Sequence, residues 1–175
     1  MLVPEQSEAR YRVREQLVNQ SLPNDAVGAT REITGAIALA PDGHIVSAQS
    51  HFEVDLRSLR SDQSRRDNFI QRNTLETSRF PTAVFEPREA SGLPWPLPEN
   101  NEFTFQLAGN LTIHGVTHPV TWDVTARIED DRLVGIAVTQ VTFQDFGMER
   151  PRVAVVLSVE ETIQLEVDFT LVREQ

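Results

Sequence analysis

The chain has 175 residues, no cysteine and sixteen basic residues, and all sixteen are arginine. The absence of cysteine and lysine excludes disulfides, thiolate zinc sites, thiol nucleophiles, lysine Schiff bases and P-loop phosphate sites. With 26 acidic residues the formal net charge is -10, which disfavours general binding to nucleic acid or to an anionic membrane surface.

The length is that of one domain with a sizeable core, and we expect a single domain over residues 1–175 with its core at about 9–172. No apolar stretch is long enough for a membrane helix, and the first ten residues lack the apolar segment of a signal peptide. We therefore expect no stable insertion into a membrane.

Apolar and polar residues alternate along most of the chain. This period of two is typical of strands with one face buried in the core (the dry face) and one face exposed to solvent. The alternation begins at Tyr11, Val13 and Leu17 and is clearest between Phe103 and Ile113. It predicts strands over residues 11–17, 26–40, 51–57, 82–88, 103–113, 120–128, 133–143 and 163–171. Glycines at 28, 35 and 135 indicate bends or close backbone approach within these strands.

Residues 61–73 (SDQSRRDNFIQRN) break the alternation, with a capping residue at the start and two apolar anchors, Phe69 and Ile70. We predict a short helix here that covers one opening of the sheet. Eight antiparallel strands joined by tight turns predict an all-β, closed or nearly closed eight-stranded barrel, because closure removes unpaired strand edges. The interior of such a barrel is either filled by side chains or holds one slender ligand.

Large apolar side chains on the dry faces are candidates to line a cavity for an apolar chain. A plain filled core is the alternative, and periodicity does not distinguish the two. The candidates are Tyr11, Val13, Phe52, Val54, Phe85, Phe103, Phe105, Trp122, Phe143, Phe146 and Phe169.

Two neighbouring arginines on the predicted helix, Arg65 and Arg66, are candidates to hold an anionic or polar head group at the mouth of the barrel. The alternative is an exposed helix face on which one arginine pairs with Asp67 for structural reasons.

No motif for catalysis or metal binding is complete. His114 and His118 lie four residues apart across a glycine-containing turn near Asp123, but no third ligand has a defined spacing. The triplet at 145–147 (DFG) matches a kinase fragment without the glycine-rich loop or the lysine of kinases, so we interpret it as a turn that lays Phe146 against the barrel. We predict no catalytic residue and no metal site.

The chain contains, in this order, FEVDL at 52–56, SDQSRRDNFI at 61–70 and RFPTAVF at 79–85. Together with LAGNLTIHGVTHPV at 107–120 and DFG at 145–147, this order resembles the signature of the YceI-like family of lipid- or polyisoprenoid-binding proteins. The resemblance covers residues 45–171. It implies an extended, lipocalin-like, eight-stranded antiparallel barrel with a helix over one opening and a long isoprenoid or fatty amphiphile inside.

The first strand departs from the family pattern. Members of the family often carry a tyrosine, an aspartate and a His-Ser pair that lead into the first strand, followed by Gly-x-Phe. Residues 11–17 (YRVREQL) lack that histidine, and residues 27–35 replace the rest. If these positions shape one mouth of the barrel, a ligand other than a prenyl pyrophosphate or a quinone is an open alternative.

We therefore predict a non-enzymatic protein that binds, transports or stores a long-chain amphiphile. The favoured ligand is an isoprenoid lipid of the quinone or polyprenyl phosphate type. We expect no other cofactor. One alternative is a barrel enzyme that acts on a hydrophobic substrate through His114 or His118. The other is a packed stress-response or interaction module without a ligand.

The resemblance also implies a bacterial protein exported to the periplasm or the extracellular space by a segment outside this sequence, with a cytoplasmic location as the alternative. A barrel rim or an unpaired strand edge offers a surface for a homodimer.

Overall fold

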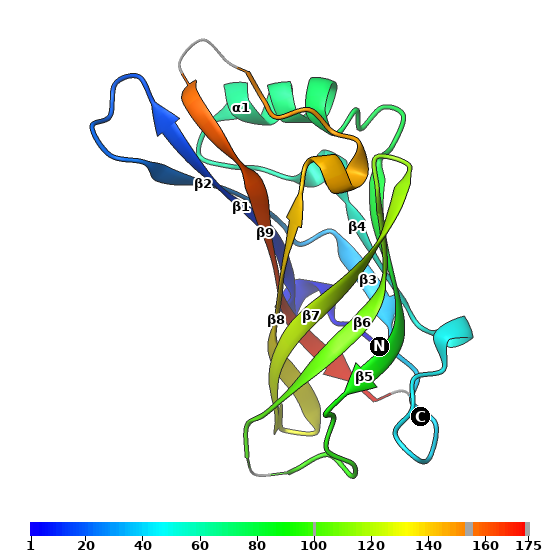
Figure 1. Cartoon of the computed structure of the whole chain (residues 1–175). Helices are drawn as coiled ribbons and strands as arrows, with labels where there is room; N and C mark the ends of the chain where they lie inside the picture. Colours follow the sequence, from blue (N-terminus) through cyan, green and yellow to red (C-terminus); the bar gives the residue numbers. More distant parts are fainter. Residues whose placement is uncertain (100, 153–155, 174–175) are drawn as a thin grey trace.

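The computed structural model describes residues 1–99, 101–152 and 156–173. These residues form one antiparallel sheet that curls around an interior (Figure 1). Its strands are β1 (Glu8–Leu17), β2 (Asn24–Thr30), β3 (Ile33–Ala36), β4 (His51–Asp55), β5 (Thr82–Ser91), β6 (Phe103–Ile113), β7 (Val116–Glu129), β8 (Arg132–Thr142) and β9 (Val156–Val172). Their order across the sheet is β2-β1-β9-β8-β7-β6-β5-β4-β3. The predicted all-β antiparallel barrel fold is confirmed.

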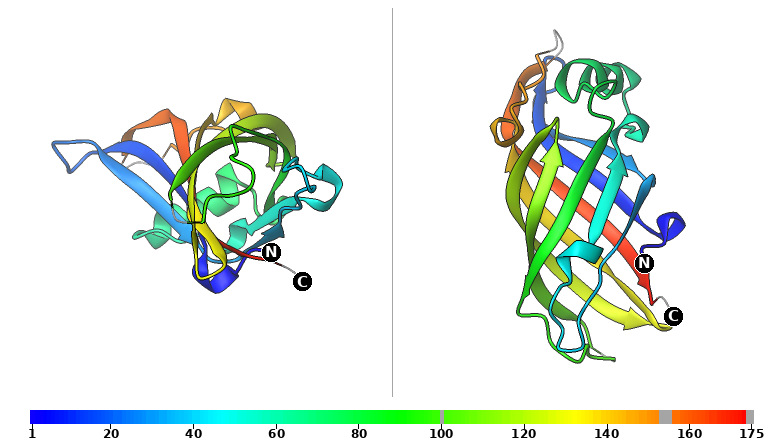
Figure 2. Two further views of the ribbon diagram at one scale, coloured as in Figure 1. Left: turned by 90° about the horizontal axis from the view of Figure 1, so that it is seen from below. Right: turned by 90° about the vertical axis from the view of Figure 1, so that its right-hand side faces the viewer.

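The two outermost strands, β2 and β3, are consecutive in the chain and are separated only by Arg31 and Glu32. Because β2 pairs with β1 and β3 pairs with β4, this bent segment joins the two ends of the sheet. Across the bend, Ala29 and Arg60 exchange two backbone hydrogen bonds of 2.9 and 3.0 Å, and the N–H of Asp55 donates to the carbonyl of Glu32 at 2.9 Å. The strands thereby surround the interior (Figure 2).

The bend corrects the prediction of one continuous strand over residues 26–40. Thr30 Oγ1 accepts a hydrogen bond from the N–H of Glu32 at 3.0 Å, so a side chain replaces a ladder partner where the strand breaks. The strand also ends at Ala36 rather than at residue 40. The eight predicted strands correspond to the nine observed ones because β2 and β3 occupy the place of a single bent strand.

The segment before β1 completes the sheet where β3 is short. The N–H of Leu2 donates to the carbonyl of Gly35 on β3 at 2.9 Å, while Leu2 also forms a bridge with Leu171 on β9. Leu2 is 4% exposed. This segment therefore fills the gap between β3 and β9 and contributes an apolar side chain to the interior.

The predicted helix over one opening is confirmed. Helix α1 (Ser64–Phe69) continues as a π-helical turn (Ile70–Thr74) and lies across one end of the barrel (Figure 1). The buried carboxylate of Asp67 accepts hydrogen bonds from the N–H and the hydroxyl of Ser61, which tie the helix to the preceding loop. The described helices include none that is long and apolar enough to cross a bilayer. Short 3₁₀ turns cover Pro4–Gln6, Ser47–Gln49, Leu56–Ser58 and Gln144–Phe146.

The Asp145-Phe146-Gly147 triplet forms a tight turn, as the sequence predicts. Asp145 Oδ2 accepts from the N–H of Thr142 at 2.7 Å, and Gly147 adopts a φ of 63°, which favours glycine. Phe146 has no exposed surface, and its ring meets His118 edge to face at 5.9 Å. The turn thus anchors the β8–β9 connection through one buried ring.

Replacing Phe146 with alanine should lower the free energy of unfolding by about 3–5 kcal/mol, because the lost ring leaves a cavity in a closed part of the core. Urea denaturation measures this loss. Leu22→Ala is the control: Leu22 is 75% exposed, and its truncation should change stability by less than about 0.5 kcal/mol. Equal losses for the two variants would contradict the assignment of Phe146 as a core anchor.

Candidate functional site

Two cavities adjoin each other inside the barrel. The lower cavity, with a volume of about 190 Å³, lies away from α1, and the upper cavity, of about 630 Å³, lies beneath α1 and is lined by Phe69 and Ile70. Residues shared by both walls are Tyr11, Leu56, Leu59, Ile113 and Leu165. The interior is therefore not a plain filled core.

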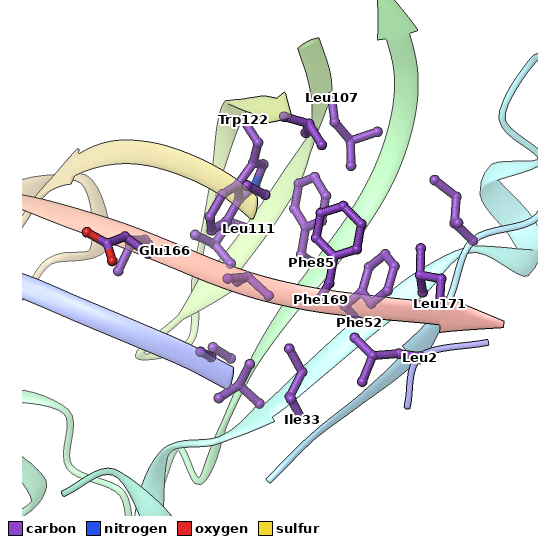
Figure 3. Close-up of a pocket in the computed structure, with 18 of the residues that line it drawn as sticks. Leu2, Ile33, Phe52, Phe85, Leu107, Leu111, Trp122, Glu166, Phe169 and Leu171 are labelled. Atoms are coloured by element: carbon purple, nitrogen blue, oxygen red, sulfur yellow. The ribbon is translucent and has the colours of Figure 1, made fainter. Parts of the chain in front are cut away.

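The lower cavity is apolar. Phe52, Phe85, Trp122 and Phe169 reach it from four different strands (Figure 3), and Phe85 meets Trp122 edge to face at 5.8 Å. Glu166 also contributes to this wall, but its carboxylate accepts a hydrogen bond from Arg10 Nε at 3.0 Å, among the outward-facing residues of β1 and β9. An apolar chain in this cavity would meet hydrocarbon and aromatic surface.

Glycines opposite the aromatic rings keep the interior open. Tyr11 pairs with Gly28 across β1 and β2, and a Cβ atom on Gly28 would lie 2.2 Å from the Tyr11 ring. In the same way Phe169 pairs with Gly135, and a Cβ atom there would lie 2.9 Å from its ring. Since each ring lies against the backbone of a neighbouring strand, it does not extend across the barrel. The predicted close backbone approach at these glycines is confirmed.

The same arrangement occurs at Phe52, which pairs with Gly35 across β4 and β3. A Cβ atom on Gly35 would lie 2.6 Å from Phe52 Cδ1, and one on Gly109 of β6 would lie 2.7 Å from the ring of Phe85. Small side chains extend the open space, because Ala9, Ala83, Ala90 and Ala137 line the lower cavity.

The upper cavity contains a buried ion pair. Glu15 projects inward from β1 and Arg66 from α1; their side chains are 5% and 13% exposed, and Glu15 Oε1 contacts Arg66 Nη2. Arg66 Nη1 also donates to Asp62 Oδ1 at 2.8 Å and to Ser61 Oγ at 3.3 Å. One guanidinium thus connects the first strand, the helix and the loop before it.

Burial raises the pKa of the Tyr11 hydroxyl to about 12, and the negative charge of Asp67 adds to this shift. The hydroxyl is therefore neutral and able to donate a hydrogen bond at physiological pH. Burial lowers the pKa of Arg66, but the charges of Glu15 and Asp62 outweigh this effect and raise it above its ordinary value. Arg66 consequently remains a cation in spite of its apolar surroundings.

Both arginines predicted to hold a head group line the upper cavity, but their environments differ. Arg66 is engaged with Glu15 and Asp62. Arg65 is exposed and forms no ion pair within the described parts of the chain. Of these two arginines, Arg65 is the one that is free, within the described residues, to meet an anion at the mouth of the upper cavity.

The structure brings most of the predicted interior side chains together. The lower cavity is lined by Tyr11, Phe52, Val54, Phe85, Phe105, Trp122 and Phe169, and the upper one by Tyr11, Val13 and Phe143. Phe103 and Phe146 line neither cavity: both are buried in the core, where Phe103 stacks on Phe105 at 6.2 Å.

Two polar features of the interior were missed by sequence reasoning. Glu15 is in phase with Tyr11, Val13 and Leu17 on the dry face of β1, and this position could have indicated a buried carboxylate that needs a cation. Trp122 Nε1 is buried without a hydrogen-bond partner among the described residues. The sequence contains no pattern that distinguishes a tryptophan with an unpaired indole N–H from one whose N–H forms a hydrogen bond.

The histidines considered for catalysis or metal binding lie outside both cavities. His114 Nε2 lies 2.6 Å from Glu76 Oε2, and His118 Nε2 lies 3.7 Å from Asp145 Oδ1. The nearby Asp123 instead accepts from Gln106 at 3.1 Å. The structure does not join His114, His118 and Asp123 into one site, and the described residues contain no group of three or more His, Asp or Glu placed to hold a metal ion.

Residues 1–171 match the family model of the YceI-like domain. The chain belongs to the YceI-like family. UPF0312 proteins of Pseudomonas putida strains W619 and GB-1 are each 28% identical to it over 135 residues, which cover 72% of this chain and 64% of those proteins. The chain thus spans less than two thirds of the length of these curated relatives.

Solved structures share this YceI-like fold. BcnA of Burkholderia cenocepacia has a TM-score of 0.71 at 14% identity, with 98% of this chain and 99% of that chain covered. A polyisoprenoid binding domain from Saccharophagus degradans has a TM-score of 0.75 at 13% identity, with 97% and 95% covered. The YceI protein of Campylobacter jejuni has a TM-score of 0.64 at 16% identity, with 85% of both chains covered. At these identities the likeness shows the fold.

Gly28→Ala should destabilise the YceI-like barrel by about 1–3 kcal/mol, because the new methyl group forces the Tyr11 ring away from β2. The same substitution in a Tyr11→Ala background should cost much less, since the ring that it displaces is absent. A double-mutant cycle in urea measures the coupling between the two positions. Equal costs in both backgrounds would show that the glycine does not accommodate the ring.

Proposed function

We propose that the protein binds a long-chain amphiphile, in the first place an isoprenoid lipid, inside the barrel and carries or stores it without chemical change. The observation that carries this proposal is the pair of adjoining cavities. They extend from α1 to Leu93 and Leu97 in the β5–β6 connection. An elongated pair of cavities of this kind suits a molecule much longer than it is wide.

The two cavities differ in polarity, and this difference favours one orientation of the ligand. The lower cavity offers an apolar surface, whereas Glu15, Arg65 and Arg66 are among the residues that line the upper one. This difference supports an orientation with the hydrocarbon tail in the lower cavity and the polar head beneath α1. Each buried methylene contributes about 0.8 kcal/mol, so about ten of them approach micromolar affinity before the costs of ordering are subtracted.

The comparisons support this class of ligand. The domain from Saccharophagus degradans that shares the fold is described as polyisoprenoid binding, and the family model covers nearly the whole chain. Family membership is also our basis for proposing that the protein acts in the periplasm, which fractionation of cells that express the full-length protein would test.

The direct test is native mass spectrometry of the purified protein, followed by organic extraction and identification of the released molecules. We expect a bound prenyl or other long-chain lipid, or uptake of one by protein that was purified without it. A barrel that is reproducibly empty and takes up no prenyl lipid would overturn the proposal.

Filling the lower cavity should prevent retention of the lipid. Ala137 on β8 lines this cavity, whereas the neighbouring Ile136 does not line either cavity and pairs with Asp168 on the outer face. Ala137→Phe should reduce the amount of lipid recovered per protein molecule by a factor of about ten or more, because the phenyl ring would occupy the part of the lower cavity that the lipid tail fills in our proposal. The matched variant Ile136→Phe should retain lipid normally. Circular dichroism confirms that both variants fold, and equal retention by the two would place the ligand elsewhere.

A further inference from the structure

The polar part of the upper cavity is built around a carboxylate. Glu15 lies on the dry face of β1, is 5% exposed and uses one oxygen, Oε1, to contact Arg66. Within residues 1–99, 101–152 and 156–173, no hydrogen bond is formed to its second oxygen, Oε2. Oε2 thus provides a hydrogen-bond acceptor in the wall of the cavity.

Among the described residues that line this cavity, Arg66 is the only cation with a largely buried side chain (13% exposed), and both of its terminal nitrogens already contact acidic partners. Nη2 contacts Glu15, and Nη1 donates to Asp62 and Ser61. An anionic ligand that took over these donors would leave Glu15 or Asp62 unpaired. An unpaired carboxylate in apolar surroundings is costly. A phosphate that left both pairs intact would meet a cation whose charge Glu15 and Asp62 already balance, so Arg66 is a poor receptor for a phosphate.

The charges around the upper cavity also oppose an anion. Glu15 and Asp67 are buried carboxylates, and the side chain of Arg66 is the one largely buried cation beside them in the described part of the chain. Arg65 and Asp62 are exposed, so water and salt screen their fields, whereas the field of the buried Glu15 is screened much less. A head group inside the cavity therefore meets an excess of negative charge.

We propose that the upper cavity selects uncharged head groups that carry an O–H or N–H donor, such as a long-chain alcohol, and discriminates against phosphate and carboxylate head groups. This inference rests on the proposed lipid binding and specifies its head group. The donor of the ligand bonds to Glu15 Oε2 while Arg66 stays paired. A phosphate finds no free buried cation among the described residues of this wall.

The test compares head groups on one chain: geranylgeraniol, its methyl ether and geranylgeranyl phosphate, each used to displace a fluorescent prenyl probe from the intact protein. The alcohol should bind more tightly than the phosphate by a factor of about ten or more, and more tightly than the ether, which lacks the donor. A phosphate that binds as tightly as the alcohol would overturn the inference, and so would an ether that equals it. If none of the three binds, the proposed function itself fails.

Glu15→Gln provides a second test. It removes the negative charge at nearly constant shape and frees part of Arg66, so the preference for alcohol over phosphate should shrink by a factor of about ten or more. Glu160→Gln is the matched control, because Glu160 is exposed on β9 and outside the walls of both cavities; its preference should equal that of the wild type. An unchanged preference in Glu15→Gln would overturn the inference. The wild-type comparison remains decisive if this variant does not fold.

Discussion

The open interior depends on pairs in which an aromatic ring on one strand lies over a glycine on the next. Eight strands enclose a space that ordinary side chains just fill, and this barrel carries several of the largest ones on its dry face. Tyr11, Phe52 and Phe169 each stand directly across from a glycine. The rings cover the glycine backbone of the neighbouring strand and so do not extend to the barrel axis. The space around the axis therefore stays open although the interior is lined by aromatic side chains.

Closure of the sheet places these pairs around one interior. The bend at Arg31 and Glu32 lets consecutive residues pair with β1 on one side and with β4 on the other. The bend holds the two edge strands of the sheet, β2 and β3, next to each other; without it the rings opposite them, Tyr11 and Phe52, would not face a common space. On the outer face, Arg10 contacts Glu166 and Asp168 across the neighbouring β1–β9 ladder. Burial raises the pKa of Glu166, but hydrogen bonds from Gln164, Arg10 and Arg12 outweigh this effect and lower it.

The sequence predicts those features of the fold that depend on local pattern. Alternation reveals each strand and its dry face, and the break in alternation reveals the helix at 64–69. Alternation does not report depth along the barrel axis, which explains why Phe103 and Phe105 share a face although only Phe105 lines a cavity. Nor does it reveal partners distant in sequence: Glu15 and Arg66 meet across 51 positions, so the buried pair becomes visible only once the strands and the helix are assembled.

The Glu15–Arg66 pair also shows why arginine, and not lysine, suits position 66. Stability alone does not account for a buried ion pair, because hydrophobic residues of similar shape are often as stabilising. A guanidinium, unlike an ammonium, presents its donors in a rigid planar fork, and Arg66 uses two terminal nitrogens to hold Glu15 and Asp62 at once. Lysine at this position would supply a point charge without that geometry. The fork fixes α1 over the cavity and, in the same contact, fixes the carboxylate that the ligand's head group would meet.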